Sequence, residues 1–196
     1  RSFALEDASF LLGEGPKLLV VACNTASAAA VDLLRERCPV EVVDVIAPGA
    51  AAALRATTGP IGVIATEATV ASEAYPQAIR ALDPRREVHS EACPLLVPIV
   101  EEGRDESDPI VLHVLCDYLR RLQRARPGAL ILGCTHFPYQ MESIAASFSR
   151  LRDYTAPDGS RPYRALVSEN ISFVDPAQFT AEQLYTALAG KERLLG

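Results

Sequence analysis

Two cysteines in this sequence occupy the same local context, directly after an apolar run and directly before small polar residues. Cys23 lies in LLVVACNTAS, and Cys134 lies in ALILGCTHFP. A thiol in such a place can act as an acid or base, a nucleophile, a metal ligand or a redox partner. It can also be a small hydrophobic side chain that only packs. The pattern alone leaves a chemical role and a packing role open for both cysteines.

The expected placement favours a chemical role. Each cysteine is predicted at the carboxyl end of a buried strand and just before a helix, where ligands of open parallel α/β sheets bind. The unpaired N–H groups and the dipole of a helix N-terminus lower the pKa of a nearby thiol and attract carboxylates. Asn24, Thr25, Thr135 and His136 add short polar groups beside the two sulfurs. Two such lobes facing each other would place one thiol on each side of a small molecule.

Other interpretations of the cysteines are weaker. A zinc site built from Cys23, Cys134 and His136 has too few ligands to be supported. A disulfide between the two cysteines is disfavoured in a reducing compartment. The remaining cysteines and histidines are interpreted as structural: Cys38, Cys93, Cys116, His89 and His113.

Short apolar runs alternate with longer helical patterns along the chain. Strands are expected at residues 18–22, 40–46, 59–66, 87–93, 129–133 and 171–175, the first of them buried on both faces. Helices are expected at residues 25–37, 48–56, 70–82, 95–102, 109–124, 138–148 and 181–189, and a long surface loop at residues 152–170. This alternation predicts an α/β fold with mostly parallel sheets and helices on both faces.

Composition excludes several classes of protein. The 196 residues are 49% hydrophobic and 22% charged, with a formal net charge of -6, and the basic residues are mixed with apolar ones. No nucleic-acid partner is therefore expected. No apolar run approaches the roughly 20 residues that span a bilayer, so no membrane association is expected. Five cysteines without a CxxC pair favour a reducing cytoplasm. Without a GxGxxG loop, a P-loop or a suitable lysine, no cofactor is expected.

Four segments resemble motifs of the glutamate racemase family, within the wider aspartate/glutamate racemase superfamily. CNTAS and GCTHFP resemble its two cysteine signatures, and GVIATEATVASEAYP (residues 62–76) resembles its threonine-rich segment. CPLLVPIVEEG (residues 93–103) is similar to a further segment that narrows the resemblance to glutamate. The likeness covers nearly the whole chain, with the motifs in the family's order.

The resemblance implies a cofactor-independent racemase that converts L-glutamate to D-glutamate for peptidoglycan, and hence for the cell wall and cell shape. Cys23 and Cys134 match the two acid/base thiols, of which one removes the α-proton while the other delivers a proton to the opposite face. The substrate-contacting or supporting positions that it implies are Asn24, Thr25, Thr66, Thr69, Glu101, Thr135 and His136. Glu102, next to Glu101, is expected to be a solvated helix residue.

The resemblance also implies two Rossmann-like lobes with the active site in the cleft between them. Residues 1–58 are expected to form the first lobe, completed by residues from about 150 to 196, and residues 59–137 the second. Residues 138–196 are expected to supply a crossover helix, the long loop and a return to the first lobe, whose sheet includes the strand at 171–175.

Arg1 matches a point after the family's opening strand, which ends in an Asp-Ser-Gly motif. The resemblance and the usual lengths of αβ units imply about 60 further N-terminal residues; the alternative is a first lobe that is partly disordered. Residues 1–196 alone are predicted to lack part of the site. The alternatives are a related racemase or isomerase acting on aspartate, hydantoins or maleate, and an inactive racemase fold that binds a partner. A homodimer is left open.

Overall fold

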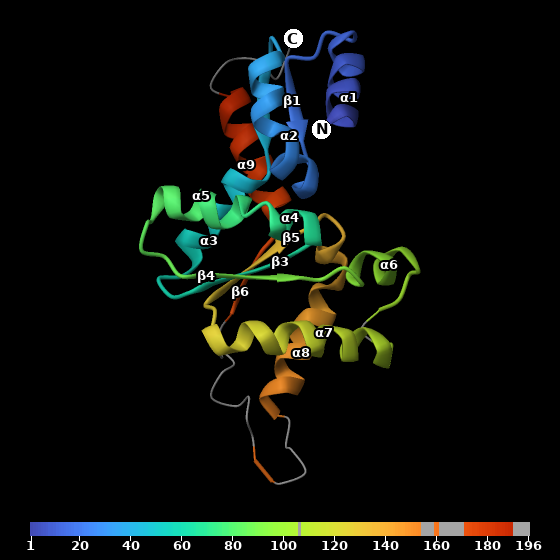
Figure 1. Ribbon diagram of the computed structural model, residues 1–196, viewed down its shortest axis with the longest axis vertical. Coiled ribbons are helices and arrows are strands. Elements are labelled where there is room, and N and C mark those ends of the chain that lie inside the picture. The colour runs from blue at the N-terminus through green and yellow to red at the C-terminus, as the bar shows by residue number, and fades with distance from the viewer. Residues whose placement is uncertain (106, 154–158, 161–170, 190–196) are drawn as a thin grey trace.

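The computed structural model describes residues 1–105, 107–153, 159–160 and 171–189. In this part of the chain the strands form two parallel sheets, a two-stranded sheet in the order β1-β2 and a four-stranded sheet in the order β4-β3-β5-β6 (Figure 1). The two sheets lie at different levels of the elongated molecule, each with its own helices. The predicted α/β fold with parallel sheets is confirmed.

The elements alternate much as the sequence predicts. The strands are β1 (Leu18–Val21), β2 (Glu41–Asp44), β3 (Ile61–Ala65), β4 (Val88–Ala92), β5 (Ala129–Gly133) and β6 (Ser172–Val174). The α-helices are α1 (Ser2–Leu12), α2 (Asn24–Arg37), α3 (Ile46–Ala56), α4 (Glu67–Ala71), α5 (Ala74–Leu82), α6 (Leu96–Glu101), α7 (Pro109–Leu122), α8 (Met141–Asp153) and α9 (Pro176–Ala189). Two short 3₁₀ helices are η1 (Gln123–Ala125) and η2 (Phe137–Gln140).

Two local differences separate these elements from the prediction. α1 lies where the sequence analysis expected no helix. The helix predicted over residues 70–82 is interrupted, because Glu73 adopts a left-handed conformation with φ of 55° between α4 and α5. Such a residue cannot continue a right-handed helix. The chain therefore turns between Thr69 and Tyr75, two residues that contribute to the site.

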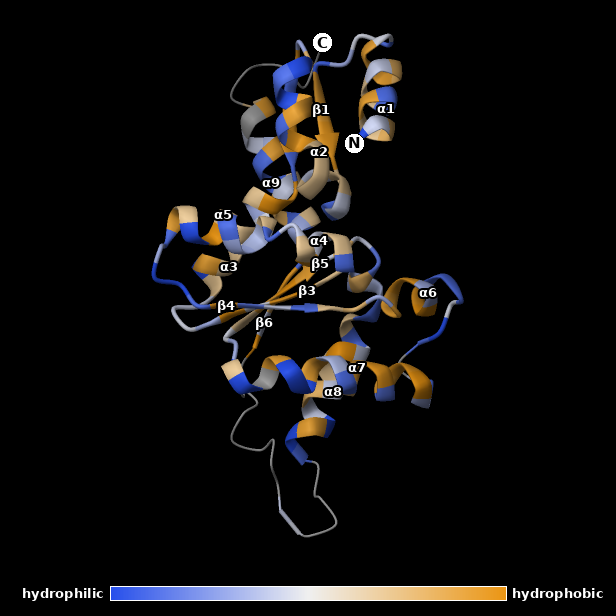
Figure 2. Ribbon diagram, in the orientation of Figure 1, coloured by the Kyte–Doolittle hydropathy of each residue, from blue (hydrophilic) through white to orange (hydrophobic). Residues whose placement is uncertain are grey.

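The centre of the four-stranded sheet is apolar on both faces. Every residue of β3 and β5 is buried, and both strands are hydrophobic in Figure 2. Ile61 and Val63 point to the core formed with α3 and α5, whereas Ile64 and Leu130 point to the core formed with α7 and α8. This alternation explains the continuous apolar runs in the sequence, since each strand packs against a layer of helices on both of its faces.

The two-stranded sheet is covered less completely. Leu19 and Val42 are buried in a small core with Ala8 of α1 and Leu34 of α2. Val20, on the opposite face of β1, is 43% exposed. The expectation that this strand is buried on both faces is therefore wrong for the residues that the structure describes, because α1 and α2 share one core and leave the Val20 face uncovered.

The last strand belongs to the other sheet. The strand expected at residues 171–175 was assigned to the sheet of the first lobe, and this is wrong, because β6 pairs with β5, with Leu130 opposite Phe173. α3 likewise packs into the core of the four-stranded sheet, where Ala50 and Ala53 meet Ile61. The lobe boundaries at residues 58 and 137 stay a prediction. The expected loop at 152–170 falls mostly outside the described residues.

Candidate active site

Cys23 stands in extended backbone at the start of α2, with φ of −82° and ψ of 124°. Its carbonyl oxygen accepts a hydrogen bond from the backbone N–H of Ser27 at 2.8 Å. The Ser27 hydroxyl donates to the carbonyl of Val21 at 2.9 Å, which ties the first turn of α2 to the end of β1. The Cys23 side chain itself is exposed. The thiol is thus exposed directly before a helix, the position that the sequence predicts.

Cys134 follows the last residue of β5 and is 8% exposed. The register of the sheet sets Gly133 opposite Ala65, so Cys134 and Thr66 begin neighbouring loops. A Cβ atom at Gly133 would lie 3.0 Å from the backbone oxygen of Ile64 and 3.1 Å from the Tyr75 ring. Glycine is needed here because the chain passes so close to both groups. The Cys134 thiol is therefore buried at the carboxyl end of the inner strand β5, whereas the Cys23 thiol is exposed.

The pKa of Cys134 does not follow the sequence-based expectation. Burial raises the pKa of this thiol, the backbone N–H of His136 lowers it, and a charge on Cys23 raises it, with burial the largest effect. The predicted lowering is therefore wrong for Cys134. The physical reason is that the chain continues into the short η2, and α8 begins only at Met141, so desolvation outweighs the nearby N–H group.

A histidine links the buried thiol to a carboxylate. Nδ1 of His136 lies 3.7 Å from Sγ of Cys134, and Nε2 of the same ring lies 3.3 Å from Oε1 of Glu101. Glu101 is the last residue of α6, which packs against η2. An imidazole between a carboxylate and a thiol can orient itself and exchange a proton with the sulfur. The structure thus brings together three residues that the sequence analysis selected from two separate motifs.

Three threonines join the two halves of the site. The hydroxyl oxygen of Thr25 lies 2.9 Å from that of Thr66 and 3.1 Å from that of Thr69, and the latter two oxygens are 3.0 Å apart. The Thr66 hydroxyl also accepts from the backbone N–H of Thr69 at 3.3 Å, so it caps α4. Because Thr25 belongs to α2, these contacts hold the helix that follows Cys23 against the loop that follows β3.

Asn24 and Thr135 complete the predicted set and lie in different surroundings. Asn24 is 4% exposed, and its Oδ1 accepts a 2.5 Å hydrogen bond from the hydroxyl of Tyr75. Thr135 is exposed beside Cys134. All of the predicted positions therefore fall around the ends of β1, β3 and β5 or on α6. Asn24 is the one whose side chain is held by a residue that was not predicted.

Sequence reasoning missed Tyr75 and two carboxylates around it. Burial raises the pKa of Tyr75 well above its usual range, and the charges of Asp44, Asp175 and Cys134 raise it further. Asp44 is the last residue of β2 and accepts from the backbone N–H of Ile46 at 3.1 Å and from Arg35 at 3.1 Å. The available signal is a carboxylate at the carboxyl end of a strand, where ligands bind in this fold class.

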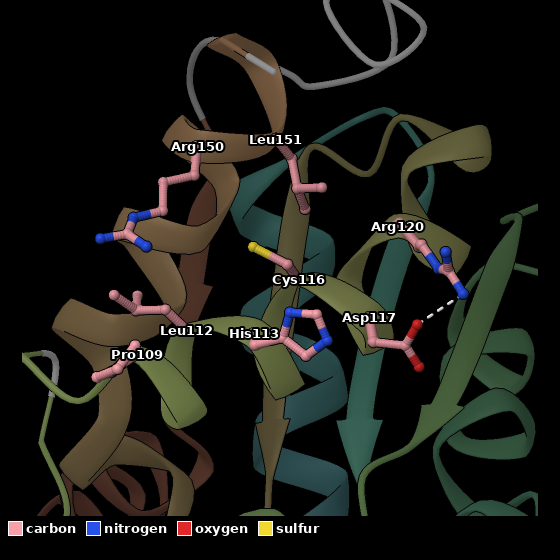
Figure 3. A pocket seen from close by; sticks show the side chains of 8 residues that line it. All are labelled: Pro109, Leu112, His113, Cys116, Asp117, Arg120, Arg150 and Leu151. Atoms are coloured by element: carbon pink, nitrogen blue, oxygen red, sulfur yellow. Dashed lines mark ion pairs between the residues drawn. The ribbon is translucent and has the colours of Figure 1, made fainter. Parts of the chain in front are cut away.

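A separate groove lies between α7 and α8 (Figure 3). It has a volume of about 460 Å³. Its lining residues are Pro109, Leu112, His113, Cys116, Asp117, Arg120, Arg150 and Leu151. Asp117 and Arg120 form an ion pair across 2.6 Å. None of the predicted site residues lines this groove, so it is not the site of the two thiols.

Two kinds of feature are absent from the described residues. No group of three or more histidine, cysteine, aspartate or glutamate side chains among them is arranged to hold a metal ion. Within the same part of the chain, no helix combines the length and the apolar character needed to cross a bilayer.

Known proteins are similar to this chain in sequence and in fold. The family model described as Asp/Glu/Hydantoin racemase matches residues 3–184. A glutamate racemase of Geobacter metallireducens is 40% identical over 194 residues, which cover 98% of this chain and 64% of that protein. A crystal structure of glutamate racemase from Bacillus anthracis superposes with a TM-score of 0.83 at 36% identity, covering 98% of this chain and 65% of that one.

A second crystal structure adds a ligand. The glutamate racemase of Francisella tularensis, solved in complex with D-glutamate, superposes with a TM-score of 0.82 at 34% identity, covering 98% of this chain and 65% of that one. The chain thus spans about two thirds of the length of each of these relatives. With a family match along nearly all of its length and the same fold, the chain belongs to the Asp/Glu/hydantoin racemase family.

Proposed function

We propose that this chain carries the two thiols of a cofactor-independent racemase that interconverts L-glutamate and D-glutamate. The observation that carries the proposal is the placement of Cys23 and Cys134 after strands of different sheets, with Thr25 of α2 in contact with Thr66, whose loop neighbours that of Cys134. The relatives at 34–40% identity are glutamate racemases, and one of them was solved with D-glutamate. These findings support glutamate as the substrate.

Racemisation at an α-carbon needs two groups on opposite faces of the substrate. A thiolate removes the α-proton, so that the C–H bond breaks, an S–H bond forms and the electron pair stays on carbon. The thiol on the other face then gives its proton to that carbon and becomes a thiolate. In the reverse reaction the two sulfurs exchange roles. Two identical groups suit this exchange because the two directions of the reaction are close to mirror images.

The surroundings of the thiols suggest how the roles are divided at rest. Burial raises the pKa of Cys134, so at neutral pH this residue is the protonated thiol that donates. Cys23, which is exposed at the start of α2, is then the base in that direction. When the reaction runs the other way, Cys134 must lose its proton, and His136 at 3.7 Å supports the resulting thiolate. Glu101 orients the imidazole from its other nitrogen.

Substrate binding falls to the groups around the sulfurs. The backbone N–H groups at the start of α2 and the hydroxyls of Thr25, Thr66 and Thr69 suit carboxylate oxygens. The same groups stabilise the negative charge that develops when the α-proton leaves, provided that water is excluded. Thr135, exposed beside Cys134, is proposed as a further contact.

Substitution of each thiol tests the mechanism. In the complete protein, Cys23→Ser and Cys134→Ser should each abolish racemisation of both enantiomers, because a hydroxyl is a far weaker acid than a thiol. The measurement is the change in optical rotation, together with incorporation of deuterium at the α-carbon in heavy water. Cys116→Ser, in the groove between α7 and α8, is the matched control and should keep the parent rate. Normal turnover of either thiol variant would refute the two-thiol mechanism.

The substrate and the mechanism can be tested separately. L-aspartate, supplied at the same concentration as L-glutamate, should be racemised at least about a hundredfold more slowly, since one methylene misplaces the second carboxylate. A faster reaction with aspartate would overturn the choice of glutamate and leave the two-thiol chemistry intact.

The biological role is proposed to be the supply of D-glutamate for bacterial peptidoglycan in the cytoplasm. The cysteines are free among the described residues, as a reducing compartment requires. A bacterial strain that depends on added D-glutamate should grow without it when it expresses the protein. If growth still required D-glutamate although purified protein racemised glutamate, this role would be wrong.

A further inference from the structure

Tyr75 lies at the centre of the candidate site without being part of any predicted set. Its side chain is 1% exposed. A Cβ atom at Gly49 of α3 would lie 3.3 Å from one edge of the ring, and one at Gly133 would lie 3.1 Å from the other edge. The ring is thus confined between α3 and the end of β5, in a space that the two glycines leave open.

The hydroxyl of Tyr75 reaches the other half of the site. It donates a 2.5 Å hydrogen bond to Oδ1 of Asn24, and both residues are buried. Burial and the neighbouring charges of Asp44 and Asp175 raise the pKa of Tyr75, so its phenol stays protonated and can act only as the donor toward this oxygen. One side chain therefore touches Gly133, the residue before Cys134, and Asn24, the residue after Cys23.

An asparagine amide has two different ends, an oxygen that accepts and an NH₂ group that donates. Because the phenol occupies the oxygen, the NH₂ group of Asn24 is left for another partner. A carboxylate ligand needs donors, and the oxygen end of the amide would repel it. The orientation of this amide therefore decides whether Asn24 favours or opposes a carboxylate bound next to Cys23.

We propose that Tyr75 is a positioning residue that fixes the Asn24 amide with its NH₂ group available to a carboxylate of the substrate. This inference rests on the proposed function, since it assumes a dicarboxylic amino acid bound between the two thiols. Tyr75 acts through Asn24 and does not touch the reacting atoms. Its ring also keeps the loop of Cys134 at a set position relative to the loop of Cys23.

Tyr75→Phe tests the proposal because it keeps the ring between Gly49 and Gly133 and removes only the hydroxyl. Without the phenol the amide can rotate, and the KM for both glutamate enantiomers should rise about tenfold, the loss expected for one buried hydrogen bond. The kcat should change by less than about threefold. Tyr118→Phe is the matched control, because this 8% exposed tyrosine also loses one hydrogen bond, from the backbone N–H of Leu95 at 3.3 Å. It should leave KM unchanged.

A double-mutant cycle separates positioning from simple stabilisation. If Tyr75 acts through Asn24, Tyr75→Phe raises KM in the parent protein and has no further effect in the Asn24→Ala background. The same comparison can be made without turnover, from the concentration of D-glutamate that protects Cys23 against iodoacetamide. An equal effect in both backgrounds, or no effect in either, would overturn the proposal. Absence of racemisation in the complete protein, with its N-terminal segment, would instead refute the proposed function, which the protection assay does not require.

Discussion

A charge on Cys23 raises the pKa of Cys134, although the two residues follow strands of different sheets. Cys23 is exposed, whereas Cys134 is 8% exposed and its thiol is held protonated mainly by burial. The pair is thus asymmetric before any ligand binds. Two chemically identical groups differ in exposure because Cys23 lies at the open start of a helix and Cys134 follows a glycine at the carboxyl end of an inner strand.

This asymmetry predicts different reactivities toward an alkylating agent. At pH 7 iodoacetamide should modify Cys23 at least about tenfold faster than Cys134, since only an accessible thiolate reacts. Cys93, which is 1% exposed and has a pKa that burial raises, should react most slowly. Mass spectrometry of the peptides from a time course gives the three rates. Equal rates at Cys23 and Cys134 would contradict the described difference in burial.

His136 should be needed for proton transfer at Cys134. His136→Asn removes the group 3.7 Å from the sulfur and should lower kcat/KM about a hundredfold, within the usual range for a general acid or base. The loss must be equal for L- and D-glutamate, because the equilibrium constant of a racemisation is one. Glu101→Gln, which keeps a neutral partner for the ring, should cost less, about tenfold.

Isotope effects locate the affected step. With α-deuterated substrates, His136→Asn should increase the isotope effect for the enantiomer whose proton goes to Cys134 and leave the other nearly unchanged. His89→Asn is the control, because this histidine pairs with Glu87 at 2.6 Å away from the thiols. A His136→Asn protein with kcat/KM within twofold of the parent would show that the imidazole takes no part.

The threonine cluster should contribute to stability as well as to the site. Thr66→Val removes the hydroxyl that caps α4 and that lies 2.9 Å from Thr25, so the free energy of unfolding should fall by about 1 kcal/mol. Thr186→Val, which removes an exposed hydroxyl bonded to the carbonyl of Glu182, should change it by less than about 0.5 kcal/mol. Urea unfolding of both variants provides the comparison. Equal losses in the two variants would mean that the Thr66 cap of α4 adds no stability beyond that of an exposed hydroxyl.

Alkaline pH should destabilise the fold through buried acids that resist ionisation. The folded pKa of Cys93 is raised from an ordinary value of 9.0, and that of Tyr75 is raised above 10.0. As pH rises through 9 and 10 the unfolded chain loses these protons while the folded chain keeps them. Stability is therefore full below pH 9 and decreases above it, by at most about 1.4 kcal/mol per pH unit for each group.

Unfolding measured across this range checks the direction. The free energy of unfolding should stay flat between pH 7 and 8 and decline from pH 9 upward. Cys93→Ala should be less stable at pH 7, but its free energy of unfolding should decline less steeply with pH. The reason is that the variant lacks one buried thiol that stays protonated in the folded state. A stability that rises with pH above 9 would contradict the direction of both pKa shifts.

The local sequence by itself determined the elements and the contexts of the two thiols. Apolar runs predict β3 and β5 because a strand between two helical layers must be apolar on both sides, and both are found. The positions of Cys23 and Cys134 directly after strands follow from the same local pattern. The resemblance of the motifs selected Glu101 and His136, which the structure joins across 35 positions of sequence.

Tertiary structure alone decided the relationships between distant segments. The sequence around β6 predicts a strand, but the sheet that it joins depends on which edge its neighbours leave open. The contact of Tyr75 with Asn24 joins residues 51 positions apart and has no local signature. The pKa of Cys134 was predicted with the wrong sign, because the helix-start rule uses the neighbouring N–H groups, whereas the actual shift is dominated by desolvation. Burial is a property of the packed molecule, and it differs between two cysteines that have the same local pattern.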